Sequence, residues 1–265
     1  MNSFEQFVCL SGLPRSGSTL LSAILSQNPA LHCEGNSPVC HLMWEMCNIL
    51  STHSEQIRAN NKESAACDIV SQIPHIYYQN IPERIVLDKC RSWTIPTNIT
   101  MLETSMKIDT KIIIMTRSII EIAESFANLY KNNHYSNDQI NTKLRELLQP
   151  NSEPLMRSIT GLNCAKKSGD GAKFLFISYD NLVTKTEETI RKIYTFCDWI
   201  PFQHSFNNII SKYAEDDTVY GLHGFHDIRQ SIGRQQYKIL LSAEIMNKCS
   251  RIDNLMEINL YSEII

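Results

Sequence analysis

The chain has 265 residues, a formal net charge of −3 and a hydrophobic content of 43%. This size and composition are ordinary for a folded protein, and we expect one domain spanning residues 1–265. The weak negative charge excludes a chain-wide positive field, so neither nucleic acid nor a membrane is an expected partner. Neither a signal peptide nor a run of 18 apolar residues is found, which predicts a cytoplasmic protein.

Short apolar runs alternate with longer helical patterns along the chain. Strands are predicted over residues 7–10, 84–88, 111–115 and 174–178, and helices near residues 20–25, 39–50, 54–78, 98–106 and 119–130. The strands lack strict alternation, which is typical of strands buried on both faces of a parallel sheet. This order predicts a three-layer α/β fold, in which helices flank a mostly parallel central sheet. The polar residues 132–170 are expected to form a helical insertion on the substrate side.

The nine cysteines are odd in number and form no C-x-x-C pair. Several of them lie in apolar runs, as Cys9 and Cys197 do. This pattern favours reduced cysteines in the core over a disulfide framework or a zinc site.

The turn between the first strand and the first helix, residues 12–19, reads G-L-P-R-S-G-S-T. It has the glycine spacing of a phosphate-binding P-loop, but Ser18 stands where that motif has its lysine. A strand, a glycine turn and a helix together direct backbone N–H groups and the positive end of the helix at one spot. Arg15 supplies a cation within the loop, and an arginine fork suits a compact anion held by two oxygens.

This loop resembles the 5′-phosphosulfate loop of sulfotransferases that use 3′-phosphoadenylyl sulfate (PAPS). In form it is most similar to the loop of the tyrosylprotein and related sulfotransferases. The resemblance implies a P-loop-like fold, a reaction that needs no metal, and 3′,5′-ADP as the nucleotide product. It also implies that the 5′-phosphosulfate is held by Arg15, Ser16, Gly17, Ser18 and Thr19.

The third predicted strand is followed by Arg117 and then by Ser118 and Glu121, which have the spacing of a capping box. A helix is therefore expected to begin at Ser118, and Ser125 falls on about the same helix face. An arginine just before the helix and a serine on the same helix face can both contact one phosphate group. The pair Arg117 and Ser125 resembles the 3′-phosphate motif of the sulfotransferases.

The second predicted strand ends in D-K-C-R-S-W at residues 88–93, which resembles a step in one branch of the family. A cation aimed at the bridging oxygen of the leaving nucleotide would stabilise the transition state, and Lys89 is our choice for it. The resemblance further places Tyr179 at the nucleotide. Arg229 and Arg234 lie in a late loop of the kind that completes the nucleotide site in this family.

The acceptor must lose a proton, so a general base is expected near the first loop. The tyrosylprotein enzymes carry their catalytic glutamate in the loop after the first helix, where Glu34 is the candidate. A gapless comparison puts Asn36 opposite that glutamate, and His32 and His41 are competitors.

These motifs predict a PAPS-dependent sulfotransferase acting on a small-molecule, carbohydrate or peptide acceptor. The acceptor pocket is expected among residues 36–80 and 132–170. Two alternatives stay open. The first is a P-loop kinase or NTPase with Asp88 as the Mg²⁺ ligand, and the second is a non-catalytic nucleotide-binding module.

Overall fold

The computed structural model describes residues 4–150, 152–235, 237 and 241–256. Its centre is a five-stranded sheet in the order β2-β3-β1-β4-β5, and every pair of neighbouring strands is parallel. The strands are β1 (Gln6–Gly12), β2 (Leu31–His32), β3 (Ile85–Lys89), β4 (Ile112–Thr116) and β5 (Phe174–Ser178). The four predicted strands are confirmed, and the two-residue β2 was not predicted.

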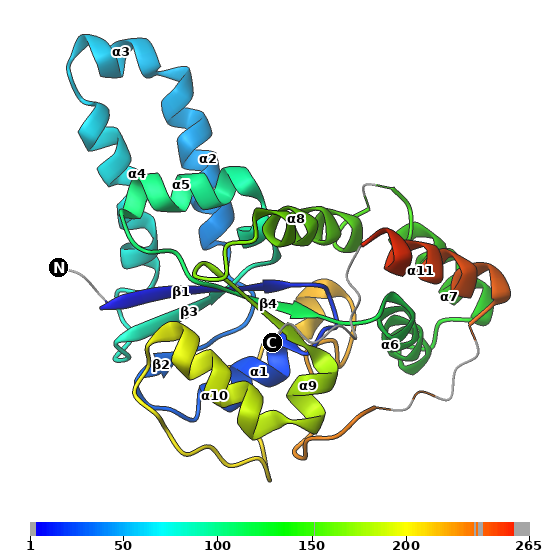
Figure 1. Cartoon of the computed structure of the whole chain (residues 1–265). Coiled ribbons are helices and arrows are strands. Elements are labelled where there is room, and N and C mark those ends of the chain that lie inside the picture. Colours follow the sequence, from blue (N-terminus) through cyan, green and yellow to red (C-terminus); the bar gives the residue numbers. More distant parts are fainter. Residues whose placement is uncertain (1–3, 151, 236, 238–240, 257–265) are drawn as a thin grey trace.

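Helices cover both faces of this sheet, so the predicted three-layer α/β fold is confirmed (Figure 1). The first half of the chain contributes α1 (Ser18–Leu25), α2 (Val39–Thr52), α3 (Ser54–Ala59), α4 (Glu63–Tyr77), the 3₁₀ helix η1 (Arg91–Thr94) and α5 (Pro96–Met106). The second half contributes α6 (Ile119–Asn132), α7 (Asn137–Leu147), α8 (Leu155–Ser168), α9 (Tyr179–Thr184), α10 (Thr186–Cys197), the 3₁₀ helix η2 (Asp217–Tyr220) and α11 (Ala243–Leu255).

Successive residues of β1 point to opposite faces of the sheet and enter two separate cores. Phe7 and Cys9 face the core under α2, α5, α6 and α8, whereas Val8 and Leu10 face the core under α1 and α10. Because both faces are buried, this strand is apolar without alternation, as the sequence indicated.

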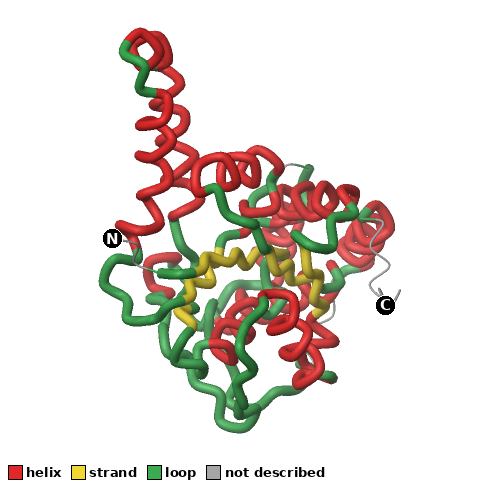
Figure 2. The backbone as a smooth tube through the Cα atoms, turned by 60° about the vertical axis from the view of Figure 1, so that its left-hand side comes forward, coloured by secondary structure: helices red, strands yellow, loops and turns green. Residues whose placement is uncertain are grey.

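The helices α2 and α4 pack side by side and project from the sheet as a hairpin, with α3 at its tip (Figures 1 and 2). The prediction of one helix over residues 54–78 is wrong, because α3 ends at Ala59 and α4 begins at Glu63. Asn61 takes a left-handed φ of +53° at this break, and asparagine tolerates that conformation better than most residues.

Residues 132–170 form α7 and α8, as the helical pattern predicted. Helix α7 packs against α6 and α11, and α8 packs against η1 and α5. None of the described helices is long and apolar enough to cross a membrane.

Helix α6 follows the predicted start at Ser118, but the capping box is not formed. The backbone N–H of Ile119 instead donates to the Asp253 carboxylate of α11 over 3.0 Å. Glu121 pairs with Arg117, with 3.3 Å between Oε2 and Nε. A carboxylate distant in sequence therefore caps the helix, and the local one holds Arg117 in place.

Candidate active site

The turn between β1 and α1 requires glycine at both of its ends. Gly12 has a φ of +134°, and a Cβ there would lie 2.2 Å from the carbonyl oxygen of Met115. Gly17 has a φ of +93°, and its Cβ would lie 2.9 Å from Cδ2 of Tyr179. Both positions exclude larger residues, so the loop passes close to β4 and α9, and most of its residues line a cavity at the sheet edge.

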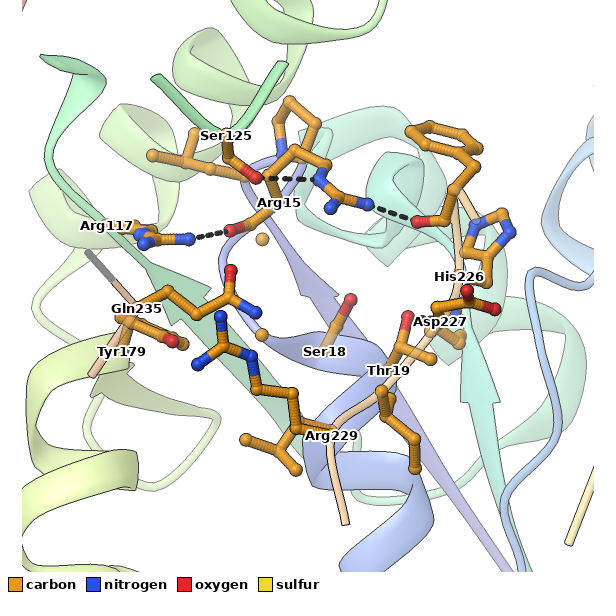
Figure 3. Close-up of a pocket in the computed structure, with 18 of the residues that line it drawn as sticks. Arg15, Ser18, Thr19, Arg117, Ser125, Tyr179, His226, Asp227, Arg229 and Gln235 are labelled. Carbon is orange, nitrogen blue, oxygen red and sulfur yellow. Dashed lines mark hydrogen bonds between the residues drawn. The ribbon is translucent and has the colours of Figure 1, made fainter. Parts of the chain in front are cut away.

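Arg15 and Arg117 are linked through this loop. Nη1 of Arg117 donates to the carbonyl oxygen of Arg15 over 2.9 Å, and Nε of Arg15 donates to Oγ of Ser125 over 3.0 Å. Arg15 also donates to the carbonyl of Phe225 (Figure 3). The guanidinium of Arg117 stacks on the ring of Tyr179. Elements far apart in the sequence thus converge on one cationic cavity.

Most of the predicted site residues line this cavity: Arg15, Gly17, Ser18, Thr19, Lys89, Arg117, Ser125, Tyr179 and Arg229. Figure 3 shows Arg229 pointing into it from the late loop. Two of the residues predicted to bind the nucleotide do not line it. Ser16 is fully buried, and its hydroxyl donates to the carbonyl of Leu13. Arg234 is half exposed and pairs with Asp180 at 2.9 Å and with Glu121 at 3.4 Å.

Lys89 ends β3, directly beside the loop. Its side chain is buried, and burial lowers the pKa of the amino group despite an opposing carboxylate. Nζ lies 3.1 Å from Oε1 of Glu215 and 3.5 Å from Oγ1 of Thr19. A buried amino group at this position can stabilise negative charge on a ligand oxygen.

Three side chains that sequence reasoning did not assign meet beside Lys89, namely Glu215, Asp217 and His226. Nδ1 of His226 lies 2.6 Å from Oδ1 of Asp217, and Nε2 lies 3.6 Å from Oε1 of Glu215. Asn36 reaches the same group, with Nδ2 3.4 Å from Glu215 and from His226. No motif spacing marked these residues, because the late loop meets β3 only in the folded chain.

The residues considered as the general base, Glu34, His32 and His41, do not line the cationic cavity. Glu34 lines an adjoining cavity, and its carboxylate lies 3.1 Å from Nε2 of the buried His32. The other ring nitrogen of His32 faces Glu83 at 3.3 Å. His41 is exposed on α2, where a hydrogen bond with Cys90 raises the pKa of its imidazole.

Asp88, the candidate Mg²⁺ ligand of the kinase alternative, is fully buried away from the cavity. It accepts hydrogen bonds from Tyr78, Trp93 and Ser37. Within the described residues, no group of three or more His, Cys, Asp or Glu side chains is arranged to hold a metal ion.

Comparison with known proteins gives a family and a fold. The family model described as the sulfotransferase family matches residues 8–203. The structure is similar to the sulfotransferase domain from the Synechococcus PCC 7002 olefin synthase, with 15% identity, 96% of each chain covered and a TM-score of 0.54. It is also similar to the sulfotransferase domain from the curacin biosynthetic pathway, with 18% identity, 94% of this chain and 97% of that one covered, and a TM-score of 0.50. No curated protein sequence matches.

Proposed function

This chain belongs to the sulfotransferase family, and from that premise we propose that its sulfuryl donor is PAPS. The single observation that carries the proposal is the cavity between the first loop and α6, where Arg15, Arg117 and Lys89 face one space. PAPS carries a 5′-phosphosulfate and a 3′-phosphate, so its site needs cations at two places on one ligand. The cavity offers such an arrangement.

The 5′-phosphosulfate is held by the loop in this proposal. Arg15 supplies the guanidinium, Ser18 and Thr19 supply hydroxyls, and Ser16 and Gly17 contribute through their backbone N–H groups. The internal hydrogen bond of the Ser16 hydroxyl supports this backbone role, because it leaves only the main chain of Ser16 for a ligand.

The 3′-phosphate is held by Arg117 and Ser125, with Tyr179 against the nucleotide. Arg117 lines the cavity and is almost fully buried, so its guanidinium has already lost most of its hydration. An incoming phosphate therefore replaces little water there, which strengthens the charge-assisted hydrogen bonds. Arg229 lines the same cavity and is a further cation for the nucleotide phosphates. We do not place Arg234 at the nucleotide, since it pairs with Asp180 and Glu121.

Transfer moves negative charge onto the oxygen that bridges the sulfuryl group and the 5′-phosphate. Lys89, beside Thr19 at the end of β3, is the cation for that oxygen. The acceptor is a hydroxyl or amine on a small molecule, carbohydrate or peptide, and the other product is 3′,5′-ADP. We also propose that the protein is located in the cytoplasm.

The test is an acceptor screen with PAPS labelled in its sulfuryl group and with chelator present. We expect label to enter an acceptor together with an equal amount of 3′,5′-ADP. Tight binding of 3′,5′-ADP without any transfer would favour a non-catalytic nucleotide-binding module. Phosphoryl transfer from ATP that depends on Mg²⁺ would contradict PAPS as the donor and favour a kinase.

A further inference from the structure

The side chain of His226 is held by two bonds to one carboxylate. Its backbone N–H donates to Oδ2 of Asp217 over 2.9 Å, and its Nδ1 lies 2.6 Å from Oδ1. Because Nδ1 donates its proton to Asp217, Nε2 carries the lone pair, which faces the donor Nδ2 of Asn36 at 3.4 Å. Both side chains are about nine-tenths buried, so the ring has a fixed orientation and a fixed tautomer.

His226 lies where the cationic cavity and the adjoining cavity meet. His226 lines the cationic cavity and also the adjoining cavity that contains Glu34, and Lys89 and Thr19 line both cavities as well. Figure 3 shows His226 at the rim of the cavity, on the far side of Asp227 from Thr19. The carboxylate of Glu215 lies between Lys89 and His226, 3.1 Å from Nζ and 3.6 Å from Nε2. The Glu215 carboxylate occupies this point, so an acceptor oxygen would bind beside Nε2 in its place.

Burial and the neighbouring charges both act on the pKa of the imidazole, and only its neutral form can accept a proton. Burial lowers the pKa of the imidazole, and the Lys89 ammonium acts in the same direction, whereas Glu215 and Asp217 raise it. The amide of Asn36 is a further polar neighbour of Nε2, at 3.4 Å. Burial is the largest of these effects and lowers the pKa of the ring, which favours the neutral imidazole that a general base requires.

Resting on the proposed donor site, we infer that His226 is the general base of the sulfuryl transfer and that Asp217 is its positioning residue. Nε2 takes the proton of the acceptor hydroxyl as the acceptor oxygen forms its bond to sulfur. The bond between sulfur and the bridging oxygen breaks, and its electron pair stays on the 3′,5′-ADP oxygen beside Lys89. The imidazolium then gives its proton to solvent. Of the earlier candidates, His32 has carboxylates at both nitrogens, and one of them is Glu34.

The experiment uses water as the acceptor, so that no natural acceptor is needed. Hydrolysis of labelled PAPS is followed in single turnovers with excess protein, and binding of 3′,5′-ADP is measured on the same samples. We expect His226→Ala to slow hydrolysis about 100-fold or more. Added imidazole should restore part of the rate, and the affinity for 3′,5′-ADP should change by less than about threefold. His223→Ala, in the same loop, is the matched control and should keep the wild-type rate.

Two more variants separate a base from a structural role. His226→Asn can still donate to Asp217 but has no basic nitrogen, so it should be as slow as His226→Ala. Glu215→Gln removes a negative charge beside Nε2, so the acid limb of the rate profile should move to lower pH.

Failure of the base assignment and failure of the proposed donor site give different experimental results. The base assignment is overturned if His226→Ala and His226→Asn keep the wild-type rate. It is also overturned if wild type binds 3′,5′-ADP but hydrolyses PAPS no faster than buffer does. Failure of the wild-type protein to bind 3′,5′-ADP would instead overturn the proposed donor site.

Discussion

Arg117 lies over the ring of Tyr179, with its guanidinium carbon 3.9 Å from the ring centroid. The same guanidinium donates to the main chain of Arg15 over 2.9 Å. The guanidinium of Arg117, just before α6, thus contacts both the start of α9 and the glycine loop. A substitution in any of the three elements should therefore affect the whole nucleotide site.

Gly17→Ala should weaken nucleotide binding as well as the fold. An alanine there must adopt a φ of +93°, with its Cβ 2.9 Å from the Tyr179 ring. Gly169→Ala is the matched control, since Gly169 also has a positive φ, of +64°, but open space around it. We expect both to lower the free energy of unfolding by about 1–2 kcal/mol. Calorimetry should show at least about tenfold weaker 3′,5′-ADP binding for Gly17→Ala alone, and equal affinities would refute the role of the loop.

Lys89→Gln should slow sulfuryl transfer far more than it weakens nucleotide binding. Removing a group that stabilises transition-state charge typically costs about 100- to 1,000-fold in kcat. Affinity for PAPS should fall by less than about tenfold, because the bridging oxygen carries little charge until its bond to sulfur breaks. Lys143→Gln removes an exposed ion pair with Glu146 and should leave both quantities unchanged. A loss of affinity as large as the loss of kcat would show that Lys89 acts in ground-state binding.

Asp253→Ala tests the cap that α11 supplies to α6. We expect a loss of about 1 kcal/mol in the free energy of unfolding, measured in urea, because the Ile119 N–H loses its acceptor. Glu244→Ala removes a carboxylate of the same helix that makes only exposed ion pairs, and it should shift the midpoint much less. Equal shifts would mean that the cap contributes no more than a surface pair does.

Asp88 should make stability depend on pH in a direction opposite to that of most carboxylates. Burial raises its pKa from 3.8 to about 6, although Ser37, Trp93 and Tyr78 donate hydrogen bonds to it. Between these values the folded chain holds a proton that the unfolded chain has lost, so this group's contribution to stability falls as pH rises through 6.

The comparison with Asp88→Asn isolates this effect from the other carboxylates. From pH 4 to pH 7 the stability of wild type relative to the variant should fall, by up to about 3 kcal/mol. Urea unfolding at several pH values measures the difference. A constant difference would mean that the pKa of Asp88 is the same in the folded and unfolded chain.

The sequence allowed good prediction of features that depend on local pattern. The four longer strands could be predicted from their apolar runs, and the loop at residues 12–19 from its glycine spacing. The parallel sheet then explains why Arg15, Lys89 and Arg117 meet, since each lies at or just beyond the carboxyl end of its strand.

Contacts between segments far apart in the sequence could not be predicted. The ion pair of Lys89 with Glu215 joins residues 126 positions apart, and no local pattern encodes it. For the same reason no local pattern indicated that Asp253, rather than Ser118 and Glu121, caps α6. The two-residue β2 is too short for any periodicity to mark it.

The most direct test of the account is calorimetric titration of the protein with 3′,5′-ADP and, in parallel, with ADP plus Mg²⁺. We predict tight binding of 3′,5′-ADP without metal. Arg117→Ala should lose at least about tenfold in affinity, because a charge-assisted hydrogen bond contributes roughly 1.5–3 kcal/mol. Binding of ADP with Mg²⁺ that is indifferent to the 3′-phosphate and to Arg117 would contradict the PAPS site.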